Sequence, residues 1–180
     1  MTSSRRLETT RLLLPPLTRD HTDDMARVYA DPEVARFVGG GGLTSETIPL
    51  QVADFADEWD LRGYGQSAVL DRKTGAFLGR IGLHYWRNWD AVELGYILDR
   101  SAQGKGIAAE ACRAWIDWVE DESSIDQLIA NIHPENTPSI GLAAKLGFSF
   151  DRHDETPSGK PTLIYRRETQ NPADSANTPN

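Results

Sequence analysis

Cysteine, long apolar runs and positive charge are all scarce in this chain of 180 residues. The single cysteine, Cys112, cannot form an internal disulfide or a cluster of thiolate metal ligands, and we expect a buried structural thiol and no metal site. No early apolar run is long enough for a signal peptide or a membrane span, so we expect a cytoplasmic protein with no membrane partner.

The shortage of positive charge bears on the partners. Lys and Arg number 19 against 27 Asp and Glu, which gives a formal net charge of −8. Phosphate repulsion argues against nucleic acid as the main partner. An anionic ligand must therefore be held by oriented amides and a few local cations, whereas a cationic substrate such as an amine is mildly favoured.

What is present indicates one globular domain. The chain is 39% hydrophobic and 26% charged, and its length suits a single core. We place the domain at residues 7–167. Residues 168–180 are predicted to be a disordered tail, because the sequence there is polar and lacks apolar periodicity. The run Gly39–Gly42 is predicted to be a flexible loop, which suits either a linker or a segment that gates substrate access.

The hydrophobic patterns predict alternating strands and helices. The expected strands are 11–14, 67–70, 76–85, 92–98, 127–132, 148–152 and 162–166, and the expected helices are 18–30, 45–62, 108–120 and 137–146, with a short turn at 33–37. Three antiparallel strands followed by strand–helix–strand crossovers predict an α/β (mixed α+β) domain built on a mixed sheet.

The most informative segment is Gln103-Gly104-Lys105-Gly106-Ile107-Ala108, which joins the strand at 92–98 to the helix at 108–120. Glycines remove the Cβ atoms that would hold an anion away from the backbone, and a helix N-terminus adds about half a positive charge. We therefore expect a pyrophosphate at this turn. The alternative is a glycine-rich connection without a ligand.

Two familiar phosphate-binding patterns fit this segment poorly. A Walker A loop needs glycine where the chain has Asp99, and serine or threonine where it has Gly106. A dinucleotide fingerprint is matched by Gly104, Gly106 and Ala109, but it also needs an acidic residue at the end of the next strand. That strand ends in His133 and Pro134, so this alternative is weak but open.

Several motifs in order resemble the RimJ/RimL branch of the GCN5-related N-acetyltransferases (GNAT). The similar segments are Leu7–Leu12 (its opening strand), Glu93–Leu98 (its fourth strand), Gln103–Ala108 (its Q/R-x-x-G-x-G/A pyrophosphate loop), Asn136–Ser139 and Lys145–Phe148. The resemblance runs from Leu7 to Arg167.

The resemblance implies acetyl-CoA as the donor and a primary amine as the acceptor, either a protein N-terminal α-amine or a small-molecule amine; it is also compatible with a homodimer. It implies a mostly antiparallel sheet whose fourth and fifth strands splay apart around the pantetheine arm. The residues that it implies in acetyl-CoA binding are the backbone of Ile97 and Leu98, the loop Gln103, Gly104, Lys105, Gly106, Ile107 and Ala108, and the polar groups of Asn136 and Ser139. Asn136 also suits a plain helix N-cap.

The usual proton donor of the family is missing. Many members have a tyrosine where this chain has Ala143, so Ser139 is our candidate for protonating the leaving thiolate, directly or through water. This departure also leaves open a non-catalytic acyl-CoA-binding regulator of the same fold.

The candidate base is Glu93, a charged residue within an apolar strand. It can take the amine proton through water, bind the ammonium, or simply face solvent. His84 is a weaker candidate, for which a structural hydrogen bond is the alternative. Trp86 and Trp89 can wall an acceptor pocket or form an ordinary hydrophobic cap.

Overall fold

The computed structural model describes residues 6–38 and 42–170. Most of the predicted glycine loop, residues 39–41, and most of the predicted tail, residues 171–180, lie outside the described residues. The strands are β1 (Leu7–Glu8), β2 (Leu12–Leu14), β3 (Gln66–Asp71), β4 (Phe77–Trp86), β5 (Ala91–Leu98), β6 (Gln127–Ile132), β7 (Ser149–Glu155) and β8 (Pro161–Glu168). The helices are η1 (Arg19–His21), α1 (Thr22–Tyr29), α2 (Pro32–Ala35), α3 (Thr47–Arg62), η3 (Arg100–Ala102), α4 (Ile107–Glu122) and α5 (Thr137–Lys145).

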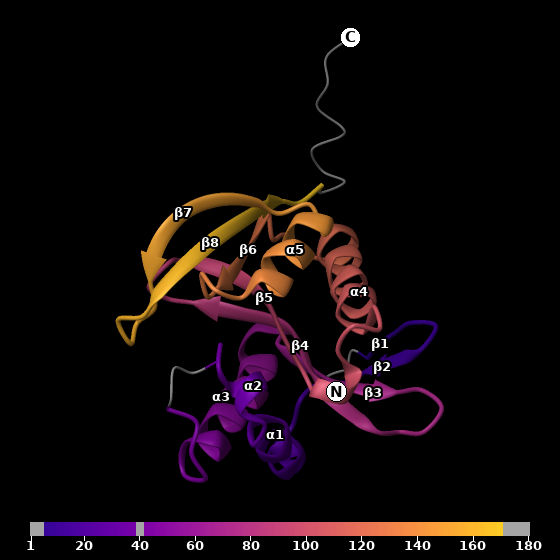
Figure 1. The fold of residues 1–180 in the computed structure, drawn as a ribbon. Coiled ribbons are helices and arrows are strands. Elements are labelled where there is room, and N and C mark those ends of the chain that lie inside the picture. Colours follow the sequence, from indigo (N-terminus) through magenta and orange to yellow (C-terminus); the bar gives the residue numbers. More distant parts are fainter. Residues whose placement is uncertain (1–5, 39–41, 171–180) are drawn as a thin grey trace.

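The strands form one sheet in the order β1-β2-β3-β4-β5-β6-β8-β7. Neighbours are antiparallel except β5 and β6, which are parallel. The predicted mixed, mostly antiparallel sheet is confirmed. Figure 1 shows α1, α2 and α3 gathered on one side of β4 and β5, with α4 and α5 on the other.

Each face of the sheet has its own hydrophobic core. On one face the buried side of α4, including Trp115, packs against the even-numbered residues of β5, such as Leu94 and Leu98. On the other face Val52 and Phe55 of α3 pack with α1 and with Ile97 of β5. Because successive side chains of a strand alternate between faces, β5 separates two different environments. Cys112 lies in the first core, fully buried as predicted.

Glycines end two of the helices, as predicted. Gly63 follows α3 with φ 73° and donates its N–H to Trp59 O. After α5, Gly147 (φ 83°) and Phe148 return their N–H groups to the carbonyls of Ala144 and Ala143. This pair of bonds is a Schellman motif, which requires a left-handed residue at the glycine.

The opening of the chain differs from its prediction. The strand expected at 11–14 is β2, but the segment 7–12, expected to resemble one strand, holds β1, a turn and the first residue of β2. The two strands pair with each other, with Leu7 opposite Leu14. The Thr9 N–H binds Leu12 O and the Thr9 hydroxyl accepts from Leu12 N, so a local turn replaces the extended backbone.

The end of the domain also differs slightly. Glu168 still pairs with Gln127 in the sheet, and the Thr169 hydroxyl donates to Ile125 O at 2.6 Å. These two residues therefore lie within the fold and not in the predicted tail. Among residues 6–38 and 42–170, no helix has both the length and the apolarity to cross a membrane.

Strands β5 and β6 diverge. Although they are neighbours, β5 and β6 are paired only at Glu93, opposite Ile129, whereas β4 and β5 are paired from Gly79–Leu98 to Trp86–Ala91. The strands thus meet near Glu93 and separate toward Leu98. This is the splay that the family resemblance implied.

Candidate active site

The predicted anion loop is built on two left-handed glycines. Gly104 has φ 70° and Gly106, the N-cap of α4, has φ 75°. Asp99 holds the turn that precedes them, because its carboxylate accepts from Ser101 N at 2.9 Å and from Ser101 Oγ at 2.6 Å. Those bonds, together with the nearby Arg27, hold the pKa of Asp99 below its ordinary value against a smaller opposing effect of burial.

The loop presents unpaired amides. Within the described part of the chain, the backbone N–H groups of residues 104–109 donate no hydrogen bond, and the first that does is Glu110 N, to Gly106 O. Six consecutive free donors at a helix N-terminus form a site for a phosphate or pyrophosphate. The Gln103 side chain donates from Nε2 to Leu98 O at 3.1 Å, which connects the loop to the end of β5.

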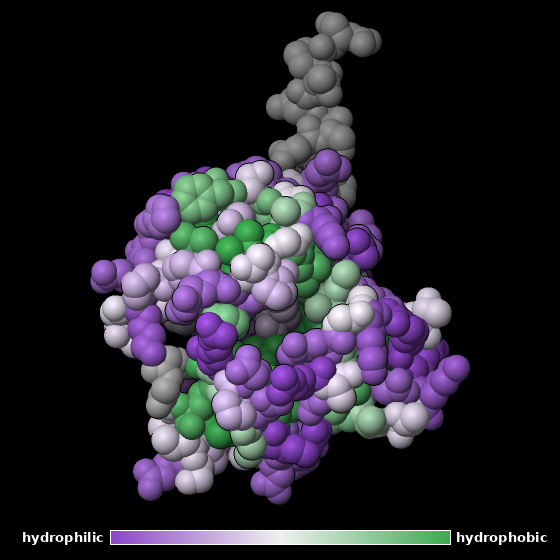
Figure 2. All heavy atoms as spheres, viewed as in Figure 1, coloured by the Kyte–Doolittle hydropathy of each residue, from purple (hydrophilic) through white to green (hydrophobic). Residues whose placement is uncertain are grey.

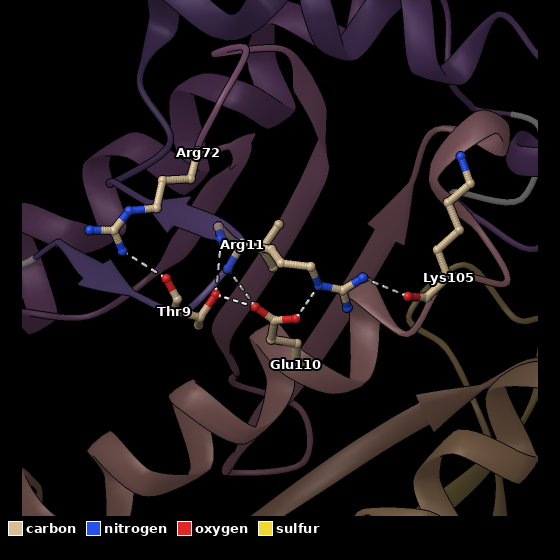
Figure 3. Close-up of polar contacts among 6 residues, drawn as sticks. Thr9, Arg11, Arg72, Lys105 and Glu110 are labelled. Atoms are coloured by element: carbon tan, nitrogen blue, oxygen red, sulfur yellow. Dashed lines mark hydrogen bonds and ion pairs between the residues drawn. The ribbon is translucent and has the colours of Figure 1, made fainter.

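A second set of contacts connects this loop to the turn between β1 and β2 (Figure 3). Arg11 donates from Nη1 to Lys105 O at 2.9 Å and from Nε to Glu110 Oε2 at 2.6 Å. The backbone N–H of Arg11 and the hydroxyl of Thr9 both donate to Glu110 Oε1. The turn between β1 and β2 is thereby fastened to the loop and to the first turn of α4, while the Lys105 side chain extends away from these contacts.

Glu110 would repel an anion at the loop if its charge were not compensated. Burial acts to raise the pKa of Glu110, but the hydrogen bonds from Thr9 and Arg11 and the charge of Arg11 outweigh it and hold the pKa below its ordinary value. Arg11 Nη2 also lies 3.5 Å from the point where Gly106 would carry a Cβ. A cation therefore lies beside the loop and pairs with this carboxylate.

The gap between β5 and β6 exposes backbone groups. The N–H of Asp99 binds Leu78 O on β4, and backbone groups alternate in direction along a strand. The groups of Ile97 are thus directed at its partner Arg80 on β4, and those of Leu98 at the gap. The predicted backbone contact with a ligand arm suits Leu98 better than Ile97, and it stays a prediction for both.

On the α4 side of the gap, α5 begins with the predicted polar residues. Asn136 is the N-cap, and its Oδ1 accepts from Ser139 N at 3.3 Å. The Tyr96 hydroxyl, from β5, donates to Ser139 O at 3.1 Å and so bridges the gap. Burial raises the pKa of Tyr96 well above its ordinary value, so this hydroxyl keeps its proton. Ala143, where the family tyrosine is missing, is buried in the core.

On the opposite face lies Glu93, which is half-buried. Trp86 Nε1 donates to Glu93 Oε2 at 2.6 Å. Burial raises the pKa of Glu93, and the Trp86 bond, the charges of His84 and Arg80 and the Asn131 amide oppose that rise only in part. The carboxyl group therefore holds a proton more readily than a surface glutamate, as a proton acceptor at a thioester requires. Its catalytic role, like that of Ser139, stays a prediction.

Beside Glu93, its cross-strand partner His84 is bound to a carboxylate of α3. His84 Nδ1 lies 2.8 Å from Glu58 Oε2, and Glu58 Oε1 accepts from Tyr85 N at 2.7 Å. Trp86 continues this aromatic surface to Trp89, with ring centroids 5.0 Å apart. The sequence did not indicate Glu58, because a glutamate within a helix is ordinarily exposed and this one is 8% exposed.

The elements that carry these two sets of side chains border a hollow. Figure 2 shows a depression near the middle of this view, with hydrophobic side chains at its floor and hydrophilic ones around it, where Figure 1 places β4, β5 and the start of α5. Ser139 and Tyr96 belong to one face of the sheet and Glu93 and His84 to the other. A group passing through the gap would have a proton donor and a proton acceptor on opposite sides.

Arg11, Glu110 and Tyr96 also belong to the site but were not predicted. An acidic residue in the first turn of a helix, such as Glu110, suits the helix dipole, and a tyrosine within an apolar strand suits the core, so neither pattern stands out. Thr9 and Arg11, two polar residues beside a short apolar strand, could have indicated a polar contact there. Nothing in the neighbouring sequence indicates that their partner is Glu110. In the described ranges, 6–38 and 42–170, no group of three or more His, Cys, Asp or Glu side chains is placed to hold a metal ion.

Comparison with known proteins gives the same family that the motifs suggested. Residues 11–149 match the acetyltransferase (GNAT) domain. An N-acetyltransferase of Bacillus licheniformis known as p20, uncharacterised in its function, is 28% identical over 164 residues, which span 88% of this chain and 92% of that protein.

Solved structures agree with the fold. An acetyltransferase of Agrobacterium tumefaciens superposes with a TM-score of 0.81 at 27% identity, over 92% of this chain and 95% of that one. RimL, a ribosomal L7/L12 α-N-protein acetyltransferase solved with coenzyme A, superposes with a TM-score of 0.77 over 92% of this chain and 99% of its own. At 16% identity, the RimL likeness shows the fold alone.

Proposed function

The chain belongs to the GNAT acetyltransferase family and is an acetyltransferase, and we propose that it moves the acetyl group of acetyl-CoA to a primary amine. A protein N-terminal α-amine is the preferred acceptor and a small-molecule amine the second. The observation that carries the proposal is the row of six free amides at residues 104–109, at the mouth of the gap between β5 and β6.

The donor would bind along this gap. The amides of the loop, with Lys105, hold the pyrophosphate, and Gln103 fixes the loop against β5. The pantetheine arm lies beside Leu98 and follows β5 toward Glu93, where the strands close. At about 3.3 Å per residue, the five steps along the strand from Leu98 to Glu93 span about 16 Å. Asn136 and Ser139 line the opposite side from the start of α5.

The chemistry then needs two proton transfers. The acceptor arrives as an ammonium ion and must lose a proton before its lone pair attacks the thioester carbonyl. Glu93, whose pKa is raised by burial, binds the ammonium or accepts that proton through water. The C–S bond breaks as the amide forms, and Ser139 supplies a proton to the departing thiolate directly or through water.

The α-amine acceptor is supported by the RimJ/RimL-like motifs and by the activity named for RimL. It is tested by incubating a cell lysate with the protein and isotopically labelled acetyl-CoA, followed by mass spectrometry of proteins and small molecules. Label on protein N-termini is the expected result. Label confined to small molecules would replace the preferred acceptor by the second.

The alternative is a regulator that binds acyl-CoA without turnover, which is favoured by Ala143 at the position of the missing tyrosine. Free thiol release, measured with a panel of amines and peptides, separates the two. The enzyme releases thiol with at least one amine, whereas the regulator binds CoA tightly with no release on any.

A further inference from the structure

We propose that His84 accepts the proton of the acceptor amine and that Glu58 positions its imidazole for that role. This inference rests on the proposed acetyl transfer to an amine. His84 lies on β4 directly opposite Glu93 of β5, and both side chains are on the sheet face covered by α3. Glu93 is in turn the residue at which β5 meets β6, where the thioester would arrive.

The contact with Glu58 selects one tautomer of His84. Tyr85 N occupies Glu58 Oε1 at 2.7 Å, which leaves Oε2 for His84 Nδ1 at 2.8 Å. A carboxylate oxygen accepts, so Nδ1 carries the proton and Nε2 keeps its lone pair. A carboxylate fixes a catalytic imidazole in this way in other enzymes, where it orients the ring for proton transfer.

Two aromatic rings hold the imidazole in place. Phe55 of α3 meets it edge-on with centroids 5.5 Å apart, and Trp86 does so at 4.9 Å. The His84 side chain nevertheless keeps 28% of its surface exposed, whereas Glu58 keeps 8%. The ring is thus fixed at Nδ1, packed on its sides and still accessible, which is the arrangement of a proton acceptor more than of a core histidine.

The contacts of His84 and Glu93 suit the two residues to different roles. Trp86 already donates to Glu93 Oε2, so this carboxyl is fixed and partly satisfied. The charged groups beside His84 are Glu58 of α3, at 2.8 Å, and its cross-strand partner Glu93 of β5. Arg62 of α3 pairs with the same Glu58 carboxylate at 3.6 Å, and Arg80 of β4 acts on Glu93. Glu93 then attracts the ammonium, and His84 removes its proton.

The transfer begins with the acceptor as an ammonium ion beside His84. One N–H bond of the ammonium breaks and its proton moves to Nε2, which leaves a neutral amine. The amine attacks the thioester carbonyl and the C–S bond breaks. The thiolate gains one proton from Ser139 of α5, directly or through water, and the nitrogen loses its second proton to water, so that amide and free thiol are the products. Ser139 then regains a proton from water and His84 releases one to it.

The test compares His84→Ala and His84→Gln with the wild type, using a peptide α-amine at saturation and thiol release as the readout. Glutamine keeps a donor for Glu58 and much of the volume, so it guards against a variant that fails to fold. His153→Gln, on the exposed surface of β7, is the matched control. Thermal melting and calorimetry with CoA verify folding and donor binding.

The expected result at pH 7 is a kcat lower by about 10²–10⁴-fold in both His84 variants, with CoA affinity unchanged. The deficit should narrow at higher pH, because an α-amine with an ordinary pKa near 8 then arrives already neutral. Added imidazole should restore part of the activity of His84→Ala. Glu58→Gln should lower kcat less, and combining it with His84→Ala should add nothing further.

Several results would overturn the assignment. One is a folded His84→Ala variant that keeps the wild-type kcat, or in which only the KM for the amine changes. Another is a loss that neither imidazole nor higher pH recovers, which would give His84 a structural role. A wild type inactive on every amine would refute the proposed function itself, whereas an active wild type with equally active His84 variants refutes this inference alone.

Discussion

Arg11 Nε and Glu110 Oε2 lie 2.6 Å apart although 99 residues separate them in the sequence. The contact joins the turn after β1 to the first turn of α4, beside the anion loop (Figure 3). The Glu110 carboxylate would repel an anionic ligand at the loop, and its pairing with Arg11 compensates that negative charge. We infer that the N-terminal hairpin preorganises the loop.

Breaking this ion pair should weaken CoA binding without unfolding the domain. Arg11→Ala removes the donor to Lys105 O as well as the partner of Glu110, so the loop must be ordered when the ligand binds. We expect CoA affinity to fall roughly tenfold, which corresponds to about 1.4 kcal/mol. Calorimetry with CoA measures it.

The control for that prediction is Arg19→Ala, which breaks the Arg19–Asp57 pair at the same 2.6 Å spacing but far from the loop. An exposed pair of this kind contributes little, so CoA binding should not change. If Arg11→Ala binds CoA as the wild type does, the hairpin has no preorganising role.

Gly106→Glu should abolish most CoA binding. Gly106 has φ 75°, and a glutamate there would place a side chain and a negative charge among the amides of the loop. We expect at least about a 100-fold loss of affinity by calorimetry. Gly75→Glu is the matched control, because Gly75 has φ 73° and nothing within 4 Å of its missing Cβ. NADH binding by the wild type would instead favour the dinucleotide reading.

The sequence was sufficient for features encoded locally. A few adjacent residues with strong conformational preferences predict each of three features: the glycine loop, the strand before it and the end of the helix at Gly147. The order of strands and helices likewise predicted the mixed sheet. These features also carried the family resemblance.

Contacts between distant segments could not be predicted. Arg11 meets Glu110, and Glu58 meets His84, only because the sheet order and the placement of α3 bring them together. The strand expected at 11–14 is present as β2, but the turn within segment 7–12 was not predicted, because the Thr9 side chain makes a local turn that an apolar pattern does not reveal. The loop of the site is thus formed by adjacent residues, whereas the part on the α3 face depends on contacts between distant segments.

Glu93→Gln should make the protein more stable at neutral pH and less active. Because the folded state raises the pKa of Glu93, it binds a proton more tightly than the unfolded chain does. The stability from this site is full below the unfolded pKa, near 4.3, and is lost as pH rises through the folded value. The melting temperatures of wild type and variant should be similar near pH 4 and should separate in favour of the variant by pH 8.

The kinetics of Glu93→Gln then separate its two candidate roles. Loss of an ammonium-binding group raises the acceptor KM with little change in kcat, whereas loss of a proton acceptor lowers kcat. CoA affinity should be retained in both cases. A variant with unchanged kcat/KM would remove Glu93 from the mechanism altogether.

Ser139→Ala should lower turnover while leaving donor binding intact. Ser139 is half-buried at the start of α5, and its backbone O accepts from the Tyr96 hydroxyl of β5. Among the contacts of the described residues, the Ser139 hydroxyl has no hydrogen bond that the substitution would break. We expect thiol release at saturation to fall by about 10²-fold or more if this hydroxyl protonates the thiolate. Ser149→Ala, on exposed β7, is the control.

Tyr96→Phe tests whether Tyr96 is the proton donor in place of Ser139. Burial raises the pKa of Tyr96 and its hydroxyl is committed to Ser139 O, so it should orient α5 and keep its proton. We expect a smaller loss of kcat than for Ser139→Ala, and a double variant no worse than Ser139→Ala alone. A Tyr96→Phe deficit larger than that of Ser139→Ala would make the phenol the acid, and full activity in both variants would leave the proton to water.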